Sequence, residues 1–192
     1  MTALTLNLHS AIELTDERFE QICHSNRDLR FERTSTGELV VMSPAGSETG
    51  RQNLGLSGQL WLWNRQFRLG VTFDSSAGFT LPNEAIRSPD ASWIKQERWD
   101  TLNTAQKRKF APICPDFVVE LCSPSDRLID VQNKMQEYLD NGTRLGWLID
   151  PETRQVEIYR QNKAIEMQSA PTSLLGEDIL PGFELDLQEI WA

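Results

Sequence analysis

The sequence predicts an α+β fold in which one mixed central β-sheet is flanked by long helices. Residues 117–122 read Phe-Val-Val-Glu-Leu-Cys, a nearly continuous apolar run that is typical of strands covered on both faces. Helical spacing of apolar residues over 47–67 and 125–142 supplies one long helix for each face. Because a chain of this length buries one sizeable core, residues 1–192 are expected to form a single domain.

Residues 1–42 are expected to add a helix and a hairpin to a core that spans residues 43–192. A threonine N-cap followed by two acids predicts a short helix over residues 15–23. Residues 31–33 and 38–42 flank a Thr-Ser-Thr-Gly turn, which predicts a β-hairpin.

The long helix over residues 47–67 is expected to bury the face that carries Leu54 and Trp61. Three short strand patterns follow it, and the polar stretch after them predicts irregular structure with one helical turn. These strands are expected at residues 71–74, 78–81 and 87–94, and the irregular stretch at 95–112.

The second half of the chain adds a helix and a hairpin to the strand at residues 117–122. The helix over 125–142 has one apolar stripe and a glycine C-cap. Residues 145–149 and 155–160 flank Asp-Pro-Glu-Thr-Arg and predict the hairpin. A strand extension is expected at residues 164–167 and a last helical turn at 185–191.

Composition excludes several classes of site. The three cysteines form no Cys-x-x-Cys pair, which argues against a disulfide framework or a cysteine-rich zinc site. With only two histidines, His9 and His24, the chain lacks the metalloprotease pattern His-Glu-x-x-His. No apolar run approaches the roughly 18 residues that span a bilayer, and the first ten residues lack the basic start of a secretory signal. The expected location is therefore the cytoplasm, with no membrane partner.

Net charge is −9, which at first sight argues against nucleic acid as a partner. Residues 164–192, however, hold six acids and no lysine or arginine, so the rest of the chain carries only −3. Charge alone neither supports nor excludes a phosphate-bearing substrate.

Two carboxylates are the main candidates for chemistry. Glu120 interrupts the apolar run of a strand that should be buried, where an ionised carboxylate is costly unless it is paired or binds a metal. Asp90 lies in a neighbouring strand pattern, so the two can converge and hold Mg²⁺ or Mn²⁺ through oxygen ligands. A purely structural role for Glu120 is about equally compatible with burial alone. Asp116 shares the face of Glu120 but lies about 13 Å away along the strand, too far to share an ion.

Lys134 is the third candidate, because the helix after the Glu120 strand could point it back over the strand end. The alternative is a surface ion pair with Asp130 or Glu137, worth only a few tenths of a kcal/mol. On local sequence alone, this surface role is favoured.

These motifs resemble the PD-(D/E)XK restriction-endonuclease-like superfamily. Two longer segments are similar to a family of small stand-alone restriction-endonuclease-like proteins that is abundant in cyanobacteria, and the resemblance covers most of the chain from about residue 43. They are Pro-Asp-Phe-Val-Val-Glu-Leu-Cys-Ser-Pro-Ser-Asp-Arg at 115–127 and Lys-Met-Gln-Glu-Tyr-Leu-Asp-Asn-Gly-Thr-Arg-Leu-Gly-Trp-Leu-Ile-Asp-Pro at 134–151, and Gly-Glu-Asp-Ile-Leu-Pro-Gly-Phe at 176–183 matches the family's ending.

The resemblance implies a restriction-endonuclease-like core and a metal site. Asp90 falls at the superfamily's metal-binding aspartate and Glu120 at its second acidic ligand. Leu121 would offer its backbone carbonyl to the same ion. Glu48 matches an acidic residue that some members place early in the first long helix.

The chain departs from the superfamily pattern at Cys122, where a lysine is expected. A thiol cannot replace an ammonium group in stabilising negative charge on a phosphoryl group. In this family the lysine is found in the following helix, and Lys134 fits that position.

The resemblance therefore implies a Mg²⁺-dependent endonuclease in which Asp90 and Glu120 hold the metal and Lys134 assists, with DNA favoured over RNA as substrate. The alternative is a catalytically inactive module that keeps the nuclease fold, supported by the net charge and by Cys122. A glycosidase acid–base pair at Asp90 and Glu120 is a weaker alternative, since no sugar-site pattern accompanies it.

Two expectations concern surfaces. A homodimer is expected because cyclic dimers are common and six tryptophans exceed the needs of one core. If nucleic acid is the substrate, the acidic segment 164–192 should lie away from the acidic pair. Basic residues should then form the rim of the cleft, namely Lys95, Arg98, the cluster at 107–109 and Arg127.

Overall fold

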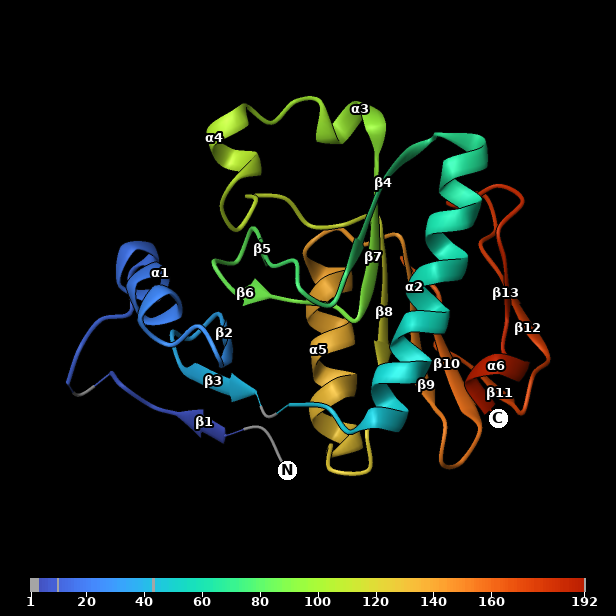
Figure 1. Cartoon of the computed structure of the whole chain (residues 1–192), viewed down its shortest axis with the longest axis horizontal. Helices are drawn as coiled ribbons and strands as arrows, with labels where there is room; N and C mark the ends of the chain where they lie inside the picture. Colours follow the sequence, from blue (N-terminus) through green and yellow to red (C-terminus); the bar gives the residue numbers. More distant parts are fainter. Residues whose placement is uncertain (1–3, 10, 43, 192) are drawn as a thin grey trace.

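A computed structural model describes residues 4–9, 11–42 and 44–191. Its centre is a mixed six-stranded sheet in the order β11-β10-β9-β8-β7-β4, and the long helices α2 and α5 cover its two faces (Figure 1). The strands are β4 (Gly70–Asp74), β7 (Ala91–Lys95), β8 (Phe117–Leu121), β9 (Leu145–Asp150), β10 (Gln155–Arg160) and β11 (Glu166–Ser169), and the helices are α2 (Ser47–Phe67) and α5 (Leu128–Asp140).

The apolar strand β8 lies in the middle of this sheet, parallel to β9 and antiparallel to β7. Alternation along β8 divides its side chains between two cores. Phe117 and Val119 pack on the α2 side, whereas Val118 packs on the α5 side with Tyr138. Glu120 shares the α5 side with Val118 because successive strand residues point to opposite faces.

The helix α2 has the predicted bounds, but the predicted buried face is wrong. Leu54 is 74% exposed and Trp61 is 49% exposed. Apolar residues occur on every face of this helix, so their spacing alone does not identify the face that is buried. The stripe that packs on the sheet consists of Gln52, Leu56, Leu60 and Trp63.

A second, five-stranded sheet lies beside α5 in the order β1-β3-β2-β6-β5. This second sheet joins the predicted hairpin to two short strands from the middle of the chain. Both residues 1–42 and residues 43–192 therefore contribute strands to it. Here β2 pairs with both β3 and β6. Its elements are β1 (Leu4–Leu6), β2 (Arg30–Arg33), β3 (Leu39–Met42), β5 (Phe79–Thr80) and β6 (Ile86–Arg87), with helix α1 (Asp16–Ser25) packed against it.

Two short helices occupy the stretch that was expected to be mostly irregular, α3 (Gln96–Trp99) and α4 (Thr104–Lys107). Beyond β11 the chain forms β12 (Ser173–Leu175), β13 (Glu184–Asp186) and α6 (Gln188–Trp191), the predicted last helical turn. This acidic C-terminal segment packs its apolar residues into the core on the α2 side, away from α5 (Figure 1). Among the helices described, none is long and apolar enough to cross a bilayer.

Candidate functional site

The two predicted carboxylates face each other across neighbouring strands. Ala91 of β7 is paired with Val119 of β8, so Asp90 stands opposite Glu120 one residue further along. The backbone N–H of Leu121 donates a 2.8 Å hydrogen bond to Asp90 Oδ2, which fixes the aspartate at the end of β8. Asp90 and Glu120, hereafter the acidic pair, therefore lie together at one end of the two strands, as the strand pattern predicts.

Lys134 reaches the acidic pair from the middle of α5. Its Nζ lies 2.9 Å from Glu120 Oε1 and 2.8 Å from Glu32 Oε1, and it donates to the backbone oxygen of Ser88 at 3.4 Å. The side chain is only 13% exposed. The helix thus turns Lys134 inward, and the surface pair with Asp130 that local sequence favoured is not formed.

Glu32 is a residue of this site that the sequence did not indicate. It lies in β2 of the second sheet and is 3% exposed. Its carboxylate binds Arg87 at 3.1 Å as well as Lys134, and it accepts a 2.9 Å hydrogen bond from the N–H of Ser88. Burial would raise the pKa of Glu32, but the Lys134 ammonium and the Arg87 guanidinium hold it below its usual value.

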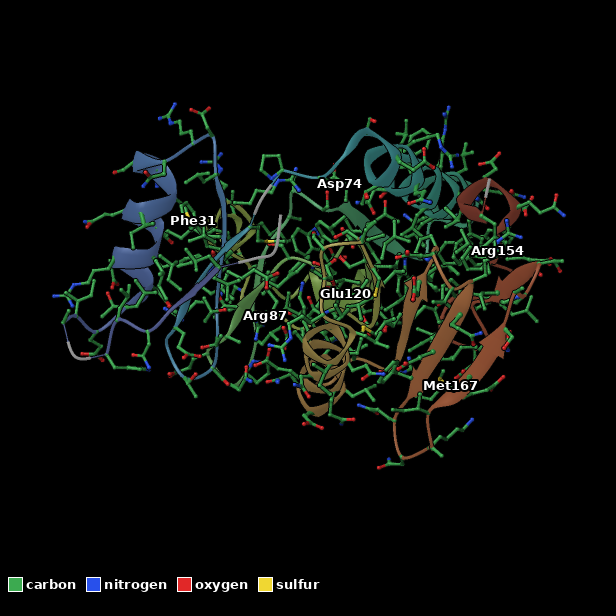
Figure 2. The ribbon with its side chains drawn as sticks, turned by 90° about the horizontal axis from the view of Figure 1, so that it is seen from below. Phe31, Asp74, Arg87, Glu120, Arg154 and Met167 are labelled. Atoms are coloured by element: carbon green, nitrogen blue, oxygen red, sulfur yellow. The ribbon has the colours of Figure 1, made fainter. Side chains whose placement is uncertain are left out.

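Glu32 lies in the sequence Arg-Phe-Glu-Arg, where alternation gives it the same face as Arg30 and predicts an exposed position. Its burial comes from contacts with residues more than fifty positions away, so no local pattern reveals it. In Figure 2, Glu120 lies beside α5 and Arg87 lies between it and the strands of the second sheet.

The acidic pair is short of positive charge. Burial raises the pKa of Glu120 to about 8, although Lys134 opposes the rise, and the carboxylates of Asp90 and Glu32 add to it. Burial also raises the pKa of Asp90 against the hydrogen bond from Leu121. Tyr138 donates a 3.0 Å hydrogen bond to Glu120 Oε1. A further cation at this position would favour the ionised form of both carboxylates.

The oxygen atoms around the acidic pair suit a hard divalent cation. Asn53 of α2 donates from Nδ2 to Asp90 Oδ1 at 3.1 Å, while its own Oδ1 is buried without a hydrogen-bond partner. Such an orphaned buried oxygen is uncommon and calls for a ligand or an ordered water. Carboxylate and amide oxygens are the ligands that Mg²⁺ and Mn²⁺ prefer, so the residues present fit such an ion.

Glu48 is not brought to the acidic pair. Its side chain is 63% exposed at the start of α2, where its Oε1 lies 2.6 Å from Arg51. Across the described ranges, no three side chains of His, Cys, Asp or Glu are placed to share an ion. The α2 residue that contacts the pair is Asn53, five positions further along the helix.

Cys122, at the superfamily's lysine position, carries no positive charge. Burial and the nearby carboxylates, Asp150 first among them, raise the pKa of its thiol to about 12. The thiol is therefore neutral at pH 7. Lys134 supplies the cation that this position lacks.

The expected basic rim is wrong for Lys95 and Arg98. Lys95 ends β7, about 16 Å along the strand from Asp90. Arg98, just beyond it, binds Asp116 at 2.9 Å. Asp116 is thus a structural partner of Arg98. Of the expected rim, only Arg127 precedes the helix that carries Lys134.

Comparison with known proteins agrees with the fold described above. A solved structure described as a putative nuclease belonging to DUF820, from Anabaena variabilis ATCC 29413, has a similar fold with a TM-score of 0.71. The two chains are 19% identical, and the similarity covers 84% of this chain and 89% of that one. No curated protein gives a significant match. The sequence model of the Uma2 family, described as "Putative restriction endonuclease", matches residues 16–188, and the chain therefore belongs to this family.

Proposed function

We propose that the protein is a metal-dependent endonuclease that hydrolyses phosphodiester bonds of DNA. The observation that carries the proposal is the position of Lys134, whose ammonium lies 2.9 Å from Glu120 where Asp90 faces the same strand end. Two carboxylates and one ammonium are the groups that the chemistry requires, and no histidine is needed. Family membership supports the reaction class.

Asp90 and Glu120 would hold Mg²⁺ or Mn²⁺, with the backbone carbonyl of Leu121 as a further ligand. The N–H of Leu121 points at Asp90, and in a strand the N–H and C=O of one residue point to the same side. The carbonyl of Leu121 is therefore directed toward the acidic pair. Asn53 Oδ1 is available to the ion or to a water bound beside it. When bound, the ion supplies Lewis-acid activation of a water and neutralises charge on the phosphate.

Lys134 is protonated over the whole useful pH range. Burial opposes its charge, but the carboxylates of Glu120 and Glu32 raise its pKa above the ordinary lysine value. A fixed ammonium next to the metal ligands stabilises the negative charge that develops on the phosphoryl oxygens. Glu32 would act on the reaction through Lys134, because its carboxylate binds the same ammonium as Glu120, at 2.8 Å.

DNA is proposed over RNA because the family description refers to restriction endonucleases, which are enzymes that cleave DNA.

The test is a cleavage assay with Mg²⁺ or Mn²⁺ on duplex DNA, single-stranded DNA and RNA. Glu120→Gln and Asp90→Asn should each lower cleavage by about 100-fold or more, as expected for loss of a metal ligand. The matched control is Glu157→Gln, on the same face and in the same row of β10. Glu157 is equally buried but binds only Gln132 and Tyr159.

Two results together would support the proposal. Cleavage should require the metal, and it should be retained by the wild type and Glu157→Gln but not by Asp90→Asn or Glu120→Gln. Absence of cleavage on all three substrates, with or without metal, would favour the inactive binding module. Cleavage of RNA alone would overturn the assignment of DNA as the substrate but not the assignment of the active-site residues.

A further inference from the structure

A cavity of about 750 Å³ is lined by residues other than the acidic pair and its contacts. Its walls come from α1, from the segment that follows α4 and from the β4–β5 connection. Phe19 of α1 packs at 5.3 Å on Phe110, and Lys109 Nζ lies 2.9 Å from Glu20 Oε2, so the walls are held together on one side. In Figure 1, α1 and α4 lie on the same side of the six-stranded sheet as α5. The name basic groove is used below for this cavity.

The basic groove is positively charged although the chain as a whole carries −9. Its lining holds four cationic side chains and one carboxylate, that of Glu20. Lys109 is paired with this carboxylate. Arg27 and Arg108 are exposed, and their guanidinium groups have no ion-pair or hydrogen-bond partner among the residues that the structure describes. Two guanidinium groups without protein acceptors favour an anionic ligand, and guanidinium geometry suits phosphate.

Aromatic rings line the same groove as these cations. Trp99, Phe73 and Phe110 line the groove, and each is only partly buried. Phe73 and Trp99 contact each other edge to face at 5.1 Å, and the ammonium of Lys107 lies 5.2 Å from the Trp99 ring. Partly open rings beside phosphate-binding cations are the combination that binds unpaired bases along a nucleic-acid strand.

We propose that the basic groove binds a single-stranded segment of nucleic acid that extends from the cleavage site. The inference deepens the proposed nuclease function and rests on it. The groove adjoins the active site through the edge of the sheet, because Phe73 of β4 is paired with Ser92 of β7, two residues after Asp90. Strand geometry gives a separation of about 8 Å between the backbone positions of Phe73 and Asp90.

We propose single-stranded nucleic acid as the ligand, and not a duplex, because of how bases stack. Bases within a duplex stack on each other, so their faces are not open to Trp99 or Phe110, whereas unpaired bases can stack on protein rings. A duplex would use only the phosphate contacts of Arg27 and Arg108. The proposal therefore predicts stronger binding of single strands than of duplexes of equal length.

Binding is measured with the full chain in EDTA, so that metal-dependent hydrolysis does not occur. The probe is a fluorescent oligothymidylate of about 15 nucleotides, followed by anisotropy at several salt concentrations. The double substitution Arg27→Ala/Arg108→Ala should weaken binding about tenfold and lower the slope of log K against log salt by roughly 1.4, about 0.7 per lost phosphate contact. The control is Arg65→Ala/Arg144→Ala, which removes the same charge from exposed positions outside the groove.

Equal weakening by the two double variants would overturn the proposal, because it would reflect net charge alone. Displacement of the probe by a mononucleotide at the same concentration would also overturn it and assign the groove to free nucleotides. A duplex that binds as tightly as the single strand would contradict the role of the rings. Because the assay contains no metal and no cleavage step, its result is separate from that of the cleavage assay.

Discussion

Lys134 is the residue on which the site depends, because it joins carboxylates from two sheets. Glu120 comes from the central sheet and Glu32 from the second sheet, and both lie within 2.9 Å of the ammonium. The superfamily pattern expects a lysine at position 122, on the strand itself. In this chain the strand position holds a neutral thiol, and the helix returns an ammonium to the same strand end. We therefore propose that Lys134 takes the role of the lysine that the pattern expects at position 122.

Lys134→Met should abolish cleavage while leaving metal binding in place. Methionine keeps most of the side-chain volume but removes the charge, so we expect cleavage to fall by about 100-fold or more, the range seen when one transition-state-stabilising group is lost. Single-turnover cleavage and Mn²⁺ binding are measured on the same preparation. Lys163→Met, at an exposed turn after β10, is the control. Cleavage by Lys134→Met within a few-fold of the wild type would contradict the assigned role.

At the scale of elements, the hairpin of β2 and β3 is a supporting part of the site, because it delivers Glu32. The hairpin pairs with β6, and the chain leaves β6 through Ser88 to reach Asp90. Arg87 binds both Glu32 and Glu137, so it links this second sheet to α5. The position of Lys134 is therefore set by its contacts with Glu32 of the second sheet and Glu120 of the central sheet.

Glu32→Gln should destabilise the protein in a pH-dependent way. The substitution removes one of the two carboxylates that each of Lys134 and Arg87 binds, and loss of hydrogen bonds between charged groups costs about 2 kcal/mol of unfolding free energy. The pKa of Glu32 is lowered in the folded state, so its contribution is present above the ordinary carboxyl pKa of 4.5 and disappears as pH falls through the lower folded value.

Urea unfolding at pH 7 and at pH values below 4.5 measures this difference between Glu32→Gln and the wild type. The two proteins should converge in stability as the pH falls below this value. Glu38→Gln, at the start of the next strand, is the control. A difference that stays constant with pH would show that the ion pairs of Glu32 do not contribute.

Several elements could be predicted from the sequence because local patterns determine them. The β8 run, the helix α2 and the hairpin of β9 and β10 all formed where apolar spacing and turn residues placed them. The start of α5 was expected near residue 125 but lies at Leu128, because Asp126 accepts hydrogen bonds from the N–H and hydroxyl of Ser123 and closes a turn first.

Tertiary contacts decided the rest. The buried face of α2 could not be read from spacing, because Leu54 and Leu56 are equally apolar and only the sheet selects between them. Glu32 entered the site through contacts distant in sequence, and Glu48 was excluded from it by its own neighbour Arg51. The proximity of Asp90 and Glu120 was predictable because it depends only on strand alternation and on the pairing of β7 with β8.

At the scale of the whole molecule, charge is separated by the central sheet. The acidic C-terminal segment packs on the α2 side, whereas the basic groove lies on the side of α5. Near its end, however, the acidic segment contacts Arg51 and Gln52, the residues that precede Asn53 in α2, so its distance from the acidic pair stays a prediction. The separation of charge by the sheet leaves the α5 side open to a polyanion in spite of the net charge of −9.

The homodimer remains a prediction, but its sequence argument is weaker than the tryptophan count indicated. Trp63, Trp93 and Trp147 are buried in the core, and Trp99 and Trp191 are partly buried against it. A dimer should give a light-scattering mass near twice 21.9 kDa at micromolar concentration. A mass near that of one chain under the same conditions would reject it.

The most direct test of the central claim is Mn²⁺ binding measured by calorimetry on the wild type, Asp90→Asn, Glu120→Gln and Glu157→Gln. If Asp90 and Glu120 hold the ion, the wild type and Glu157→Gln should bind Mn²⁺ alike, and either substitution in the acidic pair should weaken binding by about 10- to 100-fold or abolish it. Equal Mn²⁺ affinity in all four proteins would contradict the claim that this pair is the metal site of a nuclease.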